Sequence, residues 1–207
     1  MTLQNRVTPF GEIIATPERG AHMGNRGGRI HHNDRQELQT RRWASRQWIT
    51  CLLEFKGRHR MVMQPNRYTE LFFLDEVTAF AAGHRPCAEC RRDDFSRFMT
   101  AWAIGNPEYV PDGRRLHAGD VDDVLQRERV TRERTQVTFE RRLADLPDGT
   151  FVVRDGDAWL LRGGRLRRWT HAGYGESVEA DGALTVVVLT PHSIVRAFHA
   201  GYAITFG

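Results

Sequence analysis

The feature that most constrains this chain is a Cys-x-x-Cys pair, Cys87 and Cys90, which follows Pro86 and has arginines on both sides. Zinc is commonly held by thiolates at this spacing, so the pair has the form of half a zinc site. A redox dithiol and two buried thiols are the alternatives. A thioredoxin-type dithiol lies between the strand and helix of a βαβ unit, whereas a helix is predicted before this pair. We therefore expect a metal ligand pair, with Zn²⁺ as the cofactor.

A closed zinc site needs four ligands, so the pair requires partners from elsewhere in the chain. Cys51 is the only other cysteine. Strand alternation over 48–55 places it on a face with Ile49, Leu53 and Phe55, which also allows a simple core cysteine. The histidine candidates are His31 and His32, which lie in a glycine-rich loop, and then His59 and His84.

Two known families share parts of this pattern. Zinc-dependent nucleobase deaminases combine Pro-Cys-x-x-Cys with an upstream His-x-Glu, which this chain lacks. The stretch Glu70–Phe95, ELFFLDEVTAFAAGHRPCAECRRDDF, resembles the second half of the metal-binding domain of Ada-type DNA-repair proteins.

The Ada-type resemblance implies that Cys87 and Cys90 bind zinc. In that family four cysteines hold the metal, and one of an upstream pair accepts a methyl group from DNA. The corresponding stretch here, about Lys56–Arg60, contains no cysteine. Methyl acceptance is therefore not implied. The rest of the chain, including its Gly-Asn-Arg-Gly loop, resembles a bacterial protein family, and that resemblance implies no particular activity.

The basic residues suggest a polyanionic partner. The net charge is only +4, but Lys56 is the single lysine among 30 basic residues. Segment 19–67 carries ten arginines against three acidic residues. Arginine presents a planar set of donors suited to phosphate, although a high-GC genome that favours arginine codons would give the same composition. We expect contacts to nucleic acid, most simply DNA, from six arginines: Arg26, Arg29, Arg41, Arg42, Arg85 and Arg91.

Local patterns predict most of the elements. The first forty residues are expected to be mostly loop. Strands are expected over 48–55, 60–64 and 69–73, and helices over 75–83, 92–105 and 119–133. The remaining expectations are a three-stranded meander over 150–170, a strand over 182–190 and a helix over 190–202 that Thr190 caps.

These elements predict an α+β protein. We expect an N-terminal region, 1–145, organised by a zinc knuckle with a β-hairpin and amphipathic helices, and a small β-rich subdomain, 146–207. An odd number of cysteines and an N-terminus without a signal-peptide pattern favour the cytoplasm. No segment is apolar enough to predict a membrane partner.

Three functional hypotheses follow. The first is a zinc protein that binds nucleic acid, linked to DNA repair or modification. The second is a metal-dependent nuclease or related hydrolase that uses the polar loop 25–34, although no catalytic residue can be named. The third is a structural zinc domain. The sequence does not predict an oligomeric state.

Overall fold

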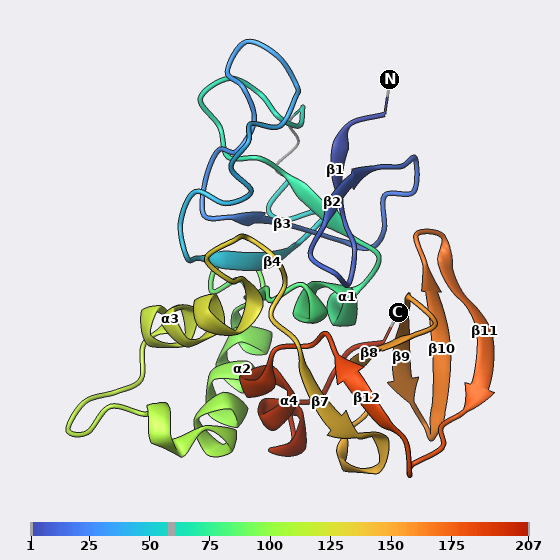
Figure 1. Cartoon of the computed structure of the whole chain (residues 1–207). Helices are drawn as coiled ribbons and strands as arrows, with labels where there is room; N and C mark the ends of the chain where they lie inside the picture. The colour runs from blue at the N-terminus through green and yellow to red at the C-terminus, as the bar shows by residue number, and fades with distance from the viewer. Residues whose placement is uncertain (1, 58–60, 207) are drawn as a thin grey trace.

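The structure, a computed structural model, describes residues 2–57 and 61–206. Its described part is an α+β fold with two six-stranded sheets and four α-helices. Figure 1 shows the first sheet in the upper half of the view and the second at the lower right, with α1 between them. Within the described residues, no helix is long and apolar enough to cross a membrane. The predicted fold class is confirmed.

The first sheet is mixed, with the strand order β2-β1-β5-β3-β4-β6. Strands β1–β2, β3–β5 and β3–β4 pair antiparallel, whereas β1–β5 and β4–β6 pair parallel. The strands are β1 (Gln4–Val7), β2 (Ile13–Ala15), β3 (His22–Arg26), β4 (Trp48–Leu52), β5 (Leu71–Phe73) and β6 (Arg85–Pro86).

The second sheet is antiparallel throughout, with the order β11-β10-β9-β8-β12-β7. Its strands are β7 (Phe139–Arg142), β8 (Phe151–Arg154), β9 (Asp157–Arg162), β10 (Arg165–Thr170), β11 (Gly173–Glu179) and β12 (Thr185–Val188). The Asp-Gly and Gly-Gly turns of the predicted meander join β8, β9 and β10 as expected.

The helices are α1 (Glu76–Ala81), α2 (Arg92–Gly105), α3 (Ala118–Arg129) and α4 (His192–His199), with short 3₁₀ turns η1 (Pro107–Tyr109) and η2 (Leu143–Asp145). The carboxylate of Asp75 caps α1 by accepting from Thr78 N at 2.9 Å. Gly83 follows that helix at φ +76°, a backbone conformation that favours glycine.

The helices α2, α3 and α4 share one core. Phe98 and Trp102 of α2 are fully buried, as the predicted apolar face requires. They pack with Leu125 of α3, Phe198 of α4 and Tyr202 beyond it. Helix α4 therefore packs against the N-terminal helices on one side, while its Val195 packs against the second sheet.

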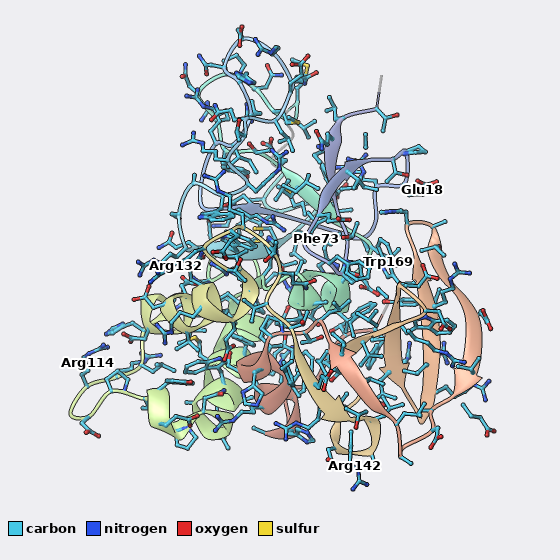
Figure 2. The ribbon with its side chains drawn as sticks, viewed as in Figure 1. Glu18, Phe73, Arg114, Arg132, Arg142 and Trp169 are labelled. Carbon is cyan, nitrogen blue, oxygen red and sulfur yellow. The ribbon has the colours of Figure 1, made fainter. Side chains whose placement is uncertain are left out.

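Helix α1 joins the two sheets. Phe73 of the first sheet packs in a cluster with Ala79 of α1 and with Ala82, the residue that follows this helix. From the second sheet, Trp169 donates its indole N–H to Thr78 Oγ1 at 3.1 Å. Figure 2 shows the labelled Phe73 and Trp169 near this short helix. Both sheets thus contact the same six-residue element.

Several sequence predictions fail locally. The first forty residues contain β1, β2 and β3 instead of mostly loop. The expected hairpin partner of β4 is absent, since residues 61–64 form no strand and β4 pairs with β3 and β6. Thr190 does not cap α4, because its hydroxyl accepts from Phe151 N at 2.9 Å. The second sheet already begins at Phe139. The division into 1–145 and 146–207 stays a prediction.

A buried carboxylate ties the C-terminal segment to the helices. Glu76 is 1% exposed and accepts from the Arg91 guanidinium, from Tyr202 Oη at 2.8 Å and from Thr205 N at 2.9 Å. Arg91 is itself buried, so each charge lacks water and depends on the other.

We predict that Glu76→Ala lowers the free energy of unfolding by about 3–5 kcal/mol, because it leaves the Arg91 charge buried without its main partner. The matched control is Glu108→Ala, which removes an exposed carboxylate paired with Arg196 and should cost far less. Urea unfolding followed by circular dichroism measures both. Equal losses in the two variants would contradict the assigned importance of burial.

Candidate metal centre

Cys51 lies on β4, which pairs with β3 on one side and with β6 on the other. In the antiparallel register of β3 and β4, Met23 is paired with Cys51 and Arg26 is paired with Trp48. Because side chains alternate along a strand, Cys51 lies on one face of the sheet and Trp48 on the other. The sheet therefore separates a sulfur-bearing face from a face built around tryptophan and arginine.

The parallel pairing of β4 with β6 brings the second cysteine to the first. Thr50 is paired with Pro86, and Cys87 N donates to Thr50 O at 2.9 Å. The chain then turns, with Arg91 N donating to Cys87 O at 3.1 Å, and α2 begins at Arg92. This turn returns Cys90 towards Cys87.

The three cysteines form one cluster. The sulfur atoms of Cys51, Cys87 and Cys90 all lie within 4.8 Å of one another, and all three are free thiols. Tetrahedral coordination with Zn–S bonds of about 2.3 Å places sulfurs about 3.8 Å apart. The cluster is therefore close enough to hold a metal ion.

Hydrogen bonding favours a thiolate at Cys87. The thiols of Cys51 and Cys90 and the backbone N–H groups of Cys90 and Glu89 lower the pKa of Cys87, against the opposing effect of burial. Donation to Cys87 raises the pKa of the Cys51 thiol. Because metals bind the thiolate form, this distribution of donors already accommodates negative charge at the cluster.

The cluster adjoins a cavity of about 280 Å³. Apolar side chains line much of it, and the polar lining includes Arg19, Asn25, Tyr68 and Glu70. Phe72, also on this lining, has the guanidinium carbons of Arg6 and Arg19 at 4.9 and 4.8 Å from its ring centroid. The sulfur face is thus accessible from a cavity instead of being sealed in a core.

The histidines predicted as ligands lie elsewhere. His31 is fully buried, with Nδ1 at 2.7 Å from Thr69 Oγ1 and Nε2 at 3.2 Å from Gln64 O. Burial lowers its pKa, which favours a neutral ring with both nitrogens engaged. Among the described residues, the cluster that could hold a metal contains neither His31 nor His32. His59 lies outside the described residues.

His84 also lies away from the sulfurs. It is fully buried, with ring centroids 5.1 Å from Trp48 and 4.7 Å from Phe73. Arg26 Nε lies 3.4 Å from its Nε2. Burial, followed by the charges of Arg26 and Arg129, lowers its pKa well below the ordinary value, so the ring stays neutral.

The six arginines predicted to contact nucleic acid divide into two groups. Arg26, Arg85 and Arg91 are buried. Arg85 forms a bidentate pair with Asp122 at 2.8 and 2.7 Å. Arg91 is held by Glu76 and Asp94. The guanidiniums of Arg85 and Arg91 are buried in ion pairs, so we exclude these two arginines from the proposed nucleic-acid surface.

Arg42 is half-buried and lines a different cavity. Arg29 and Arg41 remain accessible, and the structure adds Arg67. These three line one surface hollow of about 360 Å³, together with Ala44, Asn66 and Tyr68. Arg29 also approaches Asn66, with Nη1 3.4 Å from Oδ1. No acidic side chain of the described residues lines this arginine hollow. The sequence signal that could have identified Arg67 was its place at the end of the arginine-rich segment.

Comparisons with protein-family models, with curated protein sequences and with solved structures find no match to this chain. The functional argument therefore rests on the cysteine cluster, the arginine hollow and the contacts around them.

Proposed function

We propose that this chain is a zinc-binding protein that contacts nucleic acid. The metal part of this proposal rests on the convergence of the sulfur atoms of Cys51, Cys87 and Cys90, which lie within 4.8 Å of one another. Cys51 and Cys87 are 36 positions apart in the sequence and are brought together by the β4–β6 pairing. Three soft sulfur ligands favour Zn²⁺ over hard cations such as Mg²⁺ or Ca²⁺.

Zinc in this proposal stabilises the fold through three sulfur ligands, with its fourth position left to water or another ligand. A bound ion would connect β4 to the turn before α2, and its binding energy would add to the stability of the native state. The Ada-type resemblance of Glu70–Phe95 supports the same assignment for Cys87 and Cys90. Methyl transfer is not part of the proposal, because the upstream cysteine pair of that family has no counterpart.

The nucleic-acid part of the proposal rests on the arginine hollow. Guanidiniums at Arg29, Arg41 and Arg67 gather in one concave surface without a lining carboxylate in the described part of the chain. Such a surface suits the phosphate backbone, which fixes position without reading sequence. Outside the cysteines, the described residues contain no cluster of three histidine or acidic ligands, so no observation favours the nuclease hypothesis.

For the metal, we predict about one zinc per chain in protein purified without chelators, measured by mass spectrometry of the metal. Cys87→Ser should release most of the zinc and destabilise the fold by several kcal/mol, because metal binding contributes to folding. X-ray absorption should show three sulfurs at about 2.3 Å.

Ala88→Ser is the matched control for that variant, since Ala88 lies exposed between the two cysteines. It should retain full zinc content. Wild-type protein carrying less than about a tenth of an equivalent, and taking up none on zinc addition, would refute the metal proposal.

For nucleic acid, we predict binding to duplex DNA that weakens steeply with salt, because each phosphate neutralised releases condensed counterions. The double reversal Arg41→Glu with Arg67→Glu should weaken binding to all sequences alike and reduce the salt slope by about two. A gel-shift titration over several salt concentrations measures both effects.

Arg142→Glu is the control, because this exposed arginine lies on β7, at the lower edge of the view in Figure 2. It should leave binding nearly unchanged. The absence of any shift at micromolar protein and low salt would reduce the proposal to a structural zinc domain.

A further inference from the structure

A second cavity lies on the face of the first sheet opposite the cysteines. Its volume is about 490 Å³, within the range of small-molecule sites. Arg26 of β3 and Trp48 of β4 line it, whereas Asn25 and Cys51 of the same strands line the sulfur cavity. The other arginines that line this cationic cavity are Arg42, Arg129 and Arg134.

Arg26 is the central group of the cationic cavity. It is 3% exposed, and its guanidinium carbon lies 4.0 Å from the Trp48 ring centroid. Its Nη2 donates to Gly11 O at 2.8 Å, and its Nε lies 3.4 Å from His84. Within the described chain, Nη1 donates no hydrogen bond, and no carboxylate forms an ion pair with the guanidinium.

A second buried guanidinium increases the positive charge. Arg129 is also 3% exposed, and its guanidinium carbon lies 4.0 Å from the Trp48 ring centroid. Its partners are neutral: Gly83 O at 2.9 Å, Arg46 O at 2.6 Å and the Gln126 amide oxygen at 2.7 Å. Two buried cations therefore contact one indole without a salt bridge to either.

Burial of an arginine without a counter-ion is unfavourable, and such charges are ordinarily paired. Here burial, and then the nearby charge of Arg42, lower the pKa of Arg26 to about 9. Glu12 is the one carboxylate that lines the cavity in the described part of the chain, and it is exposed. An anion from solution would supply the charge that the protein lacks.

We propose that the cationic cavity binds the phosphate group of a small phosphate ester, with Arg26 and Arg42 as its anion-binding residues. Guanidinium donors match phosphate oxygens in geometry and charge. The half-buried ring of Trp43 lines the same cavity and offers a flat apolar surface for the organic part of the ligand, such as a nucleobase.

This site is distinct from the arginine hollow. Arg29, Arg41 and Arg67 line the hollow but not the cationic cavity, and Arg42 lines the cavity but not the hollow. Binding of a small phosphate ester therefore does not depend on duplex binding, and each can fail without the other.

Isothermal titration calorimetry at low salt tests the site with three probes: inorganic phosphate, a nucleoside 5′-monophosphate and the matching nucleoside. We expect saturable one-to-one binding of both phosphate probes and none of the nucleoside. Arg42→Gln should weaken the monophosphate about tenfold, because it removes a charge-assisted hydrogen bond. Arg142→Gln is the control, because this exposed arginine of β7 lines neither the cationic cavity nor the arginine hollow, and it should change affinity less than about twofold.

A second variant, Arg26→Lys, keeps the charge but removes the planar donors, and should also weaken binding in protein with unchanged circular dichroism. A 5′-phosphorylated oligonucleotide compared with its 5′-hydroxyl counterpart separates a strand end from a free nucleotide as the source of the phosphate. No saturable binding of either phosphate probe at millimolar concentration, or equal losses in Arg42→Gln and Arg142→Gln, would overturn the proposal.

Discussion

The pairing of β4 with both β3 and β6 determines where the chemistry of this protein lies. Trp48 and Thr50 face one side of the sheet, and Ile49 and Cys51 face the other. The parallel pairing with β6 adds Cys87 beside Cys51, which no local turn could achieve. Without this register the sulfurs would not converge, and Arg26 and Arg129 would lose the indole that they share.

Arginine in this fold is as much an interior residue as a surface one. Arg85, Arg91 and Arg129 join elements through carboxylates, carbonyls or the Trp48 ring. Arginine can do this because its five donors satisfy several acceptors at once and its plane stacks on aromatic rings. Composition alone therefore overstates the charge that the surface presents. One group of accessible arginines is formed by Arg29, Arg41 and Arg67, which line the arginine hollow.

Local signals predicted the elements that depend on local energetics. The apolar spacing of Phe98 and Trp102 identified α2, and the Asp-Gly and Gly-Gly turns identified the meander. Strand β3 was missed because His-Met-Gly-Asn-Arg has no apolar alternation, and it is a strand only between β5 and β4. Alternation correctly grouped Cys51 with Ile49, but its approach to Cys87 required a non-local pairing. Asp122, 37 residues from Arg85, gave no sequence signal as its partner.

The sulfur cluster and the cationic cavity lie on opposite faces of the same two strands, β3 and β4. A ligand that binds only the native state stabilises that state by mass action, and this holds for a metal and an anion alike. Zinc at the cysteines would hold β4 against the turn after β6. On the opposite face of the sheet, a phosphate at Arg26 would reduce the charge repulsion between Arg26 of β3 and Arg129 of α3. Since β3 and β4 are paired through Met23–Cys51 and Arg26–Trp48, either ligand would protect the same strand pair from opening. Linkage is reciprocal, so any gain that zinc gives to anion affinity must equal the gain that the anion gives to zinc affinity.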